Sequence, residues 1–303
     1  MNIQDLDAAE TKLQTYCKLR GPGLRLKLLR IKEFGHRYLL SEFFHRIHIS
    51  FDITSRLFWG RNIKLPIDDV DSKYLFMFGL LGKAELPLTK YLIKNSSPET
   101  VFYDIGANYG FFSYLVNECA APNGEVHLFE ANKSVYEYLK RNVSLKDTRI
   151  HSNNIAVSSL DGEVDFFSAF SSGASGISTT VSELVAERPN QFISSKVPSI
   201  KLDTYTKSHK TPTIMKLDVE GGELEVLKGA QELLTNHKVV VAMEVWSGDL
   251  GQAHSQHSAI FLKNLGYEQY ALSDNGDLVE SLDCMPTNGY ANYIFKKNAT
   301  NTD

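Results

Sequence analysis

Five polar side chains in the second part of the chain follow apolar runs and have the chemistry of a binding site. They are Asp104, Glu130, Asn154, Asp218 and Glu244. Each falls at or just after the end of a predicted strand, and an α/β sheet binds its ligands beyond the carboxyl ends of its strands. One such residue could be a helix cap or a solvated acid. Five of them at five strand ends predict a single site.

The first of these acids lies in VFYDIGANYG, residues 101–110, where a predicted strand runs into a glycine turn. Gly106 and Gly110 have the spacing G-x-x-x-G, which differs from the G-x-G-x-x-G that lets a backbone approach a pyrophosphate. Asp104 also places a carboxylate where the phosphates of a dinucleotide would need donors and positive potential. The turn therefore suits a ligand with an ammonium group and no phosphate.

Glu130 ends the next predicted strand, where a carboxylate can accept hydrogen bonds from both hydroxyls of a ribose. A nucleoside with an amino-acid tail satisfies both acids, and S-adenosylmethionine is such a ligand. The predicted cofactor-binding residues here are Asp104, Gly106, Asn108, Gly110, Glu130, Asn154 and Ala156. Gly106 would bring the backbone close to the methionine moiety, and Asn108 would offer its amide to the carboxylate. Asn154 and Ala156 would border the adenine.

Strands and helices alternate from residue 99 onward, which indicates an α/β fold with a mostly parallel sheet and helices on both faces. Apolar runs predict strands at 101–104, 125–130, 150–157, 213–218, 238–245, 267–272 and 291–296, with a short extension at 163–167. Helical periodicity predicts helices at 111–120, 134–145, 222–234 and 259–265. Residues 168–182, rich in Ser and Thr, predict a mobile loop near an acceptor pocket.

Four segments carry a resemblance to a known family: FYDIGANYGFFSYL, HLFEANKSVYEYLKRNV, NIAVSSLDGEVDF and, most specifically, KLDVEGGELEVLKGA. Over roughly residues 57 to 250 the chain resembles the FkbM-type methyltransferases, class I S-adenosylmethionine enzymes. The resemblance implies a Rossmann-like class I sheet of seven strands, mostly parallel with the last antiparallel. It also implies methyl transfer to oxygen, commonly a hydroxyl of a sugar, glycan or glycosylated product. Gly222 stands where the family usually has alanine.

Such a reaction makes definite demands on the site. Displacement at a sulfonium is in line, so the acceptor oxygen must be collinear with the methyl group and the sulfur. A sugar hydroxyl is a poor nucleophile, and a base or a metal must take or stabilise its proton. We expect Asp218 nearest the reaction centre, with Glu220 and Glu244 shaping the acceptor site. Lys216, two residues before Asp218, could neutralise that acid or hold an acceptor oxygen.

Further hypotheses concern the same site, although no metal ligands are assigned. The three acids could hold Mg²⁺, which prefers oxygen ligands. His254 and His257 lie in a predicted loop before the helix at 259–265, where either could replace Asp218 as the base. Helix capping or solvation is the simpler interpretation of both histidines. Glu85, in the lead-in to the sheet, could reach the ammonium group of the cofactor.

The composition is that of an ordinary globular protein, with 43% hydrophobic and 22% charged residues. A net charge of −4 gives no reason to expect nucleic acid. Three cysteines without a CxxC pair suggest neither a disulfide framework nor a zinc cage, and a reducing cytoplasm fits them. No apolar run approaches the roughly 18 residues of a membrane span, and the first residues lack the features of a signal peptide.

Residues 1–95 are predicted to be a helical, basic extension and lead-in, and residues 96–303 the methyltransferase domain. From Lys18 to Arg46 there are eight Lys and Arg against two Glu, with leucines and aromatic residues between them. The simplest interpretation is a helix that packs on the catalytic domain with its bases in water. The alternative is a peripheral contact, through residues 18–50, with an anionic membrane surface or a partner in glycan biosynthesis.

Two other functions compete with methyl transfer. An NAD(P)-dependent Rossmann oxidoreductase is disfavoured by the glycine spacing and by Asp104. A non-catalytic module that keeps the fold as a scaffold would predict gaps among the strand-end acids, and the sequence has none. The acceptor itself does not follow from the sequence.

Overall fold

The computed structural model describes residues 3–47, 49–143, 147–169, 192–247, 249–280, 286 and 289–297. The chain divides into two compact units, one made mainly of the residues up to Leu86 and the other starting at Pro87. Among the described residues, no helix combines the length and the apolar character that crossing a bilayer requires. The predicted domain boundary after residue 95 stays a prediction.

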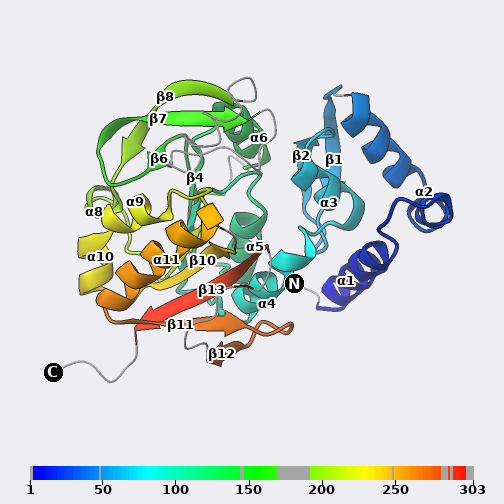
Figure 1. The fold of residues 1–303 in the computed structure, drawn as a ribbon. Helices are drawn as coiled ribbons and strands as arrows, with labels where there is room; N and C mark the ends of the chain where they lie inside the picture. Colours follow the sequence, from blue (N-terminus) through cyan, green and yellow to red (C-terminus); the bar gives the residue numbers. More distant parts are fainter. Residues whose placement is uncertain are drawn as a thin grey trace. The chain divides into compact units, whose positions relative to one another are not determined.

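The first unit combines helices with a β-hairpin (Figure 1). Its elements are α1 (Ile3–Lys18), α2 (Leu24–Ile47), β1 (Asp52–Arg56), β2 (Asn62–Pro66), α3 (Val70–Phe78) and the 3₁₀ helix η1 (Lys83–Glu85). Aromatic rings of three helices pack together. The ring centroid of Tyr16 in α1 lies 5.6 Å from that of Phe34 in α2 and 5.3 Å from that of Phe78 in α3. The helical character predicted for this part of the chain is confirmed.

Helix α2 covers most of the basic segment and is not a regular amphipathic helix. Gly35 has φ 57° and ψ −138°, which interrupts the helical backbone in its middle. Several apolar side chains of α2 are exposed: Leu24, Leu28, Leu39, Leu40, Phe43 and Ile47. The membrane contact proposed for this segment stays a prediction.

The second unit is built on a central sheet of eight strands in the order β12-β11-β13-β10-β9-β3-β4-β5. The strands are β3 (Val101–Ile105), β4 (Glu125–Phe129), β5 (Ile150–Asn153), β9 (Ile214–Leu217), β10 (Val240–Trp246), β11 (Tyr267–Leu272), β12 (Leu278–Glu280) and β13 (Tyr290–Lys297). Parallel pairing runs from β5 to β10, and β13 is antiparallel to both of its neighbours. The predicted mostly parallel sheet of seven strands, with the last antiparallel, is confirmed. The short edge strand β12 is an addition to it.

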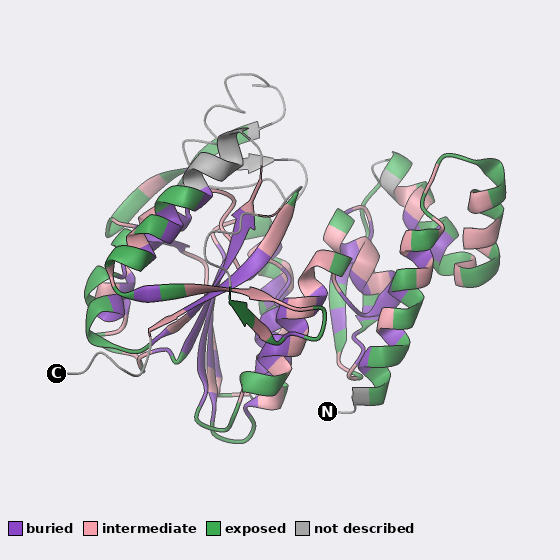
Figure 2. Cartoon of the chain, turned by 60° about the horizontal axis from the view of Figure 1, so that its bottom comes forward, coloured by how far each residue is buried: buried purple, intermediate pink, exposed green. Residues whose placement is uncertain are grey.

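Helices cover both faces of this sheet (Figure 1). They are α4 (Leu86–Asn95), α5 (Phe111–Cys119), α6 (Lys133–Asn142), α8 (Leu202–Tyr205), α9 (Glu223–Lys228), α10 (Gln231–Asn236) and α11 (Asp249–Asn264). The central strands β3, β4, β9 and β10 are buried almost throughout, because helices remove both of their faces from water, whereas the outer strands are more exposed (Figure 2). One continuous core joins the side chains of α8 to α11 to one face of the sheet.

The single strand predicted at 150–157 is wrong, because the chain changes sheets within it. β5 ends at Asn153, and β6 (Ala156–Val157) belongs to a separate sheet of three strands in the order β6-β8-β7. The predicted extension at 163–167 is β7 (Gly162–Ala169), which pairs antiparallel with β8 (Phe192–Ile200). The strand β8 was not predicted from the sequence. The predicted loop at 168–182 lies outside the described residues from residue 170 onward.

Two predicted helices also differ from the structure. The helix at 222–234 is divided into α9 and α10 at Gly229, where a Cβ atom would stand 2.0 Å from the carbonyl oxygen of Ser158. The helix at 259–265 is the end of α11, which begins ten residues earlier at Asp249. Its first turns bury the small polar residue Ser255, so that apolar periodicity starts only near Ala259.

Candidate active site

The register of the central sheet aligns the ends of three strands, β3, β4 and β9, with a position inside a fourth, because β10 continues to Trp246. Ile105 of β3 is paired with both Phe129 of β4 and Leu217 of β9, so the residues that follow these three strands lie at one level. The residues in question are Gly106, Glu130 and Asp218. Met243 of β10 pairs with Leu217, which brings Glu244 to the same level. The predicted gathering of acids at one edge of the sheet therefore agrees with the pairing of the strands.

Glu130 is held directly beneath the glycine turn. Its Oε2 accepts a hydrogen bond from the backbone N–H of Asn108 (2.9 Å), and its Oε1 accepts one from the backbone N–H of Asn132 (2.8 Å). The side chain is only 9% exposed, and this burial raises the pKa of Glu130 to about 7 against the opposing effect of the two N–H donors. Each carboxylate oxygen keeps acceptor capacity for one more donor, which fits the two hydroxyls of a ribose.

Asn108 contributes to the turn through its backbone. Its φ of 49° lies in the left-handed region, which asparagine tolerates better than most residues do. This conformation aims its N–H at Glu130. The predicted role of its side-chain amide toward the cofactor stays a prediction.

Gly106 is required by a close approach of two strand ends. Its φ is 78°, and a Cβ atom there would stand 1.8 Å from the backbone oxygen of Asp218. Gly110, with φ 84°, precedes α5, and a Cβ atom at this position would stand 2.7 Å from the ring of Tyr114. Both glycines therefore allow the turn to pack tightly against its own surroundings, a reason that sequence spacing alone does not reveal.

Asp104 is wholly buried and joins three elements. Its Oδ2 accepts a hydrogen bond from the hydroxyl of Ser113 in α5 (2.6 Å), and its Oδ1 lies 3.7 Å from the Nζ atom of Lys216 in β9. Burial raises the pKa of Asp104, and the charge of Lys216 opposes that rise. Oδ1 has no hydrogen-bond partner within the part of the chain that the structure describes. Contact with a cofactor ammonium group stays a prediction.

Lys216 links this buried acid to a more accessible one. Its Nζ atom donates a hydrogen bond to Asp218 Oδ2 (3.0 Å) and lies 5.3 Å from the centroid of the Phe112 ring. Lys216 is 3% exposed, whereas the side chain of Asp218 is 32% exposed. The structure thus forms a chain of charges, Asp104–Lys216–Asp218, that ends at an acid within reach of solvent. The distance is consistent with the expectation that Lys216 could neutralise Asp218.

The loop after β9 is fixed by a residue that sequence analysis missed. Glu223 is 6% exposed, and its Oε1 accepts hydrogen bonds from the N–H groups of Val219 (3.1 Å) and Gly221 (3.2 Å). Between these two residues lies Glu220, whose φ of 53° is uncommon for a residue other than glycine. The one signal in the sequence was an acid directly after two glycines at the start of a helix, where the helix dipole favours negative charge.

Glu244 and Asn154 are engaged in contacts of their own. Glu244, 7% exposed, accepts a hydrogen bond at Oε2 from the indole N–H of Trp246 (2.7 Å) and lies opposite Asn292 of β13. The amide of Asn154 donates to the backbone oxygen of Glu130 (2.8 Å) and so holds the segment that follows β4. Their predicted roles, toward the acceptor and the adenine respectively, stay predictions.

The remaining predicted residues lie elsewhere. Ala156 is in β6, and Glu85 is in η1 of the first unit. His257 is exposed and lies in α11, not in the predicted loop. The backbone of His254 also lies in α11, and its side chain is outside the described residues. Helix α11 simply begins earlier than its apolar pattern indicates.

The magnesium hypothesis gains no support from the arrangement of the acids. Asp218, Glu220 and Glu244 are all described, yet no group of three potential metal ligands forms around them. The one such group found in the described part of the chain is Glu125, His127 and His151, on the other face of the sheet.

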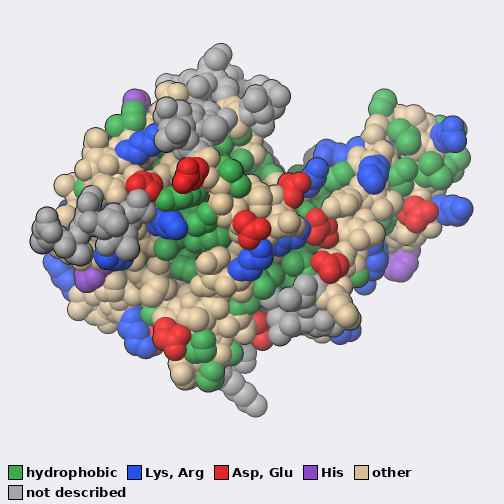
Figure 3. Space-filling view, turned by 90° about the horizontal axis from the view of Figure 1, so that it is seen from below, with side chains coloured by type: hydrophobic (Ala, Val, Ile, Leu, Met, Phe, Trp, Pro, Cys, Tyr) green, Lys and Arg blue, Asp and Glu red, His purple; other side chains and the backbone are tan. Residues whose placement is uncertain are grey.

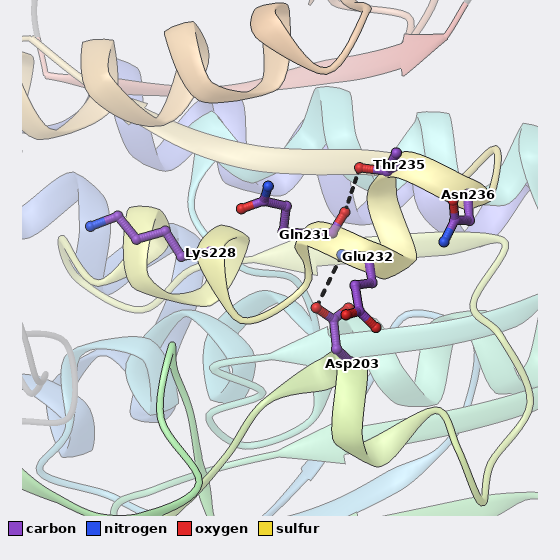
Figure 4. Close-up of a pocket in the computed structure, with 6 residues that line it drawn as sticks. All are labelled: Asp203, Lys228, Gln231, Glu232, Thr235 and Asn236. Atoms are coloured by element: carbon purple, nitrogen blue, oxygen red, sulfur yellow. Dashed lines mark hydrogen bonds between the residues drawn. The ribbon is translucent and has the colours of Figure 1, made fainter.

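A pocket at the surface of α10 is not a candidate active site. It is lined by Asp203, Lys228, Gln231, Glu232, Thr235 and Asn236 (Figure 4). Asp203 accepts hydrogen bonds from the N–H groups of Glu232 (3.0 Å) and Leu233 (2.8 Å), and so caps the start of α10. Its carboxylate thereby has a structural role, and none of the predicted site residues lines the pocket.

Comparisons with known proteins place the chain in a family. Residues 104–269 match the Methyltransferase FkbM domain, a range that begins at the buried acid of β3 and ends in β11. Hexuronic acid methyltransferase AglP of Haloferax volcanii is 25% identical over 168 residues. That match covers 55% of this chain and 64% of the relative, just under two thirds of its length.

Solved structures of methyltransferases are similar at a lower level. The structure of an FkbM methyltransferase from Methylobacillus flagellatus has a TM-score of 0.44 and 15% identity, covering 97% of this chain and 60% of that one. An O-methyltransferase from Bacillus cereus in complex with SAH has a TM-score of 0.39 and 12% identity, covering 70% and 78% respectively. Neither similarity is close enough to assign a cofactor or a substrate.

Proposed function

Because the chain belongs to the FkbM methyltransferase family, we propose that it transfers a methyl group from S-adenosylmethionine to a hydroxyl group of a sugar or glycan. The observation that carries the cofactor is Glu130, buried beneath the glycine turn with one backbone donor on each carboxylate oxygen. Two ribose hydroxyls would complete its hydrogen bonding. No finding supports the oxidoreductase alternative.

Residues of the turn and of the two neighbouring strands would hold the cofactor. Glu130 would bind the ribose, the turn from Gly106 to Gly110 would lie along the methionine moiety, and Asn154 with Ala156 would border the adenine. When bound, S-adenosylmethionine supplies an electrophilic methyl group on a sulfonium centre. The task left to the protein is to orient the acceptor and to remove its proton.

Asp218 is the residue that we propose for proton removal. It stands at the end of β9, beside Gly106, and is the exposed end of the Asp104–Lys216–Asp218 chain. The hydrogen bond from Lys216 orients one carboxylate oxygen and also weakens this acid as a base. Glu220, two residues further on in the loop that Glu223 holds, is therefore the second candidate for the base.

The acceptor is proposed from the relative in Haloferax volcanii, whose name describes a hexuronic acid methyltransferase. A hexuronic acid carries a carboxylate beside its hydroxyl groups, and a cation near the reaction centre would favour it. Lys216 at the end of β9 is buried between Asp104 and Asp218, so its charge is already balanced and the relative alone supports this acceptor. The acceptor class is thus a sugar hydroxyl, with hexuronic acids the first to be tested.

Calorimetric titration tests the cofactor, and an acceptor screen tests the reaction. We expect S-adenosylhomocysteine to bind the purified protein and NAD⁺ not to bind. Methyl-labelled S-adenosylmethionine is then incubated with the protein and three acceptors: glycans with hexuronic acid, glycans without it, and peptides. The glycans with hexuronic acid should be labelled. Binding of NAD⁺ alone would refute the proposal, and label in a peptide but in no glycan would refute the acceptor class.

A further inference from the structure

A second group of reactive side chains lies on the face of the sheet opposite Asp104. His127 is the register partner of Tyr103, the residue before Asp104, so side-chain alternation points the histidine and the acid to opposite faces. Glu125 precedes His127 by two residues on β4, and His151 is paired with His127 on β5. One ligand atom from each of Glu125, His127 and His151 lies within 4.8 Å of the other two.

His127 has a geometry that suits a metal ligand. Its side chain is 1% exposed, and its Nδ1 atom lies 2.9 Å from the hydroxyl of Tyr205. Its Nε2 atom is buried without a hydrogen-bond partner among the described residues, and lies 3.6 Å from Glu125 Oε2. When Nδ1–H is donated to Tyr205, the lone pair of Nε2 faces Glu125. Metal-bound histidines characteristically donate their other ring N–H in this way.

The groups around His127 indicate which positive charge a bound metal cation would replace. The ring of His151 stacks on that of His127 at 4.4 Å, and the ring of His209 is 5.6 Å from it. Protons on more than one of these rings would repel one another. Lys210 now supplies the positive charge, because its Nζ atom lies 2.6 Å from Glu125 Oε1. The Lys210 side chain is 61% exposed, so it can leave this contact for water.

We propose that Glu125, His127 and His151 bind one Zn²⁺ ion, with water as the remaining ligand. Zinc takes imidazole nitrogen and carboxylate oxygen in a tetrahedral arrangement, and two histidines with one glutamate supply three of its four ligands. The ion would connect β4 with β5 and would add to the stability of the sheet. The site is separate from the methyltransferase site, since its ligands and Asp104 occupy opposite faces.

The sequence contains no short motif for this site. His127 and His151 lie on separate strands, and only the parallel pairing of β4 with β5 brings them together. The usual zinc signatures depend on ligands a few residues apart.

The test is a zinc titration of the full chain, without a histidine tag, after removal of metals with a chelator. Competition against a chromophoric chelator should show one zinc per chain, and zinc should raise the melting temperature. His151→Gln should weaken zinc binding more than about tenfold, because even changes to outer-shell groups cost roughly 10- to 100-fold. Lys210→Met should tighten zinc binding, because it releases Glu125 from its ion pair.

The control is His237→Gln, which changes an exposed histidine after α10 and should leave zinc affinity unchanged. His151 is partly exposed, so its substitution should leave the fold intact, which circular dichroism would check. Zinc affinity that is the same in wild type and His151→Gln would overturn the proposal. Weak binding of several zinc ions, lowered equally by His237→Gln, would overturn it as well.

Discussion

The protonation of Glu130 should control cofactor binding. Its pKa of about 7 lies above its ordinary value because burial penalises the charged form. Protonated Glu130 contributes fully to folding stability at pH values below the pKa that this residue has in the unfolded chain. The contribution is lost as the pH rises through about 7, its pKa in the folded protein. Hydroxyl donors of a ribose, in contrast, favour the carboxylate. Cofactor binding and folding stability should therefore respond to pH in opposite directions.

We expect the dissociation constant of S-adenosylhomocysteine to fall about tenfold between pH 6 and pH 8, following the ionised fraction of a group with a pKa near 7. Calorimetry at several pH values measures this change. Glu130→Gln should bind more weakly and show little dependence on pH, since its amide does not titrate. A variant with the wild-type pH profile would remove Glu130 from the binding site.

Gly106 offers a test of the close approach between β3 and β9. Gly106→Ala should destabilise the protein by about 2 to 5 kcal/mol, the sum of about 1–2 for a left-handed backbone and about 1–3 for overpacking. Gly266→Ala is the matched control, because Gly266 has a similar φ of 83° but nothing within 4 Å of an added Cβ atom. Gly266→Ala should be destabilised only by the backbone contribution of about 1–2 kcal/mol. Equal losses in urea unfolding would contradict the predicted clash with Asp218.

At the scale of elements, Lys216 connects β9 to β3 through a buried carboxylate. Removing one partner of a buried ion pair leaves the other charge uncompensated, at a cost of about 3–5 kcal/mol. Lys216→Met should therefore destabilise the protein by about this amount at pH 8. The loss should be smaller at pH 5, because burial raises the pKa of Asp104 and its protonated form needs no counter-charge.

Urea unfolding at the two pH values measures this effect. The control is Lys228→Met, which removes an exposed ion pair with Glu225 within α9. That change should cost no more than about 0.5 kcal/mol at either pH. A loss in Lys216→Met that does not depend on pH would show that Asp104 is not the acid that Lys216 neutralises.

Most of the central sheet could be predicted from the sequence, because its strands are short apolar runs between helices with strong periodicity. The departures have local causes that depend on contacts distant in sequence. Asn154 bonds to the backbone after β4, and the chain then turns away from the central sheet to form β6. Helix α10 starts anew because Asp203, far away in the chain, caps it. Patterns of neighbouring residues contain neither contact.

The site was predictable to a similar extent. Side chains at strand ends could be identified because their positions depend only on where each apolar run stops. Glu223, Ser113 and Trp246 could not, because each acts through a hydrogen bond to another residue of the site. The same limit applies to His127 and His151, whose proximity depends on the order of strands in the sheet.

At the scale of the whole molecule, charge gives little guidance to function. Acidic and basic side chains are interspersed on the face shown in Figure 3, as expected for a net charge of −4. The division of the chain is more informative. Helix α4 begins at the boundary of the two units and contacts the turn between β11 and β12, where Lys94 forms an ion pair with Asp277 (2.7 Å). This contact assigns α4 to the second unit.

Two shortened chains would test where the catalytic domain begins. A chain of residues 87–303 keeps almost all of α4 and should fold and bind S-adenosylhomocysteine within about threefold of the full chain, a difference of about 0.7 kcal/mol. A chain of residues 96–303 loses the buried side chains of Leu88, Tyr91 and Leu92. At about 1.5–3 kcal/mol for each, this loss approaches the net stability of a typical domain, and the chain should be largely unfolded.

The chain of residues 87–303 lacks Glu85, so it also tests the role predicted for this residue. Contact between this acid and the cofactor ammonium group predicts weaker binding by the fragment and, equally, by the full chain with Glu85→Gln. Tight binding by both would remove Glu85 from the cofactor site and would locate the whole site in the second unit. Weak binding by the fragment together with normal binding by Glu85→Gln would instead show that the first unit supports the site through other residues. Calorimetry with the three proteins under one set of conditions distinguishes these results.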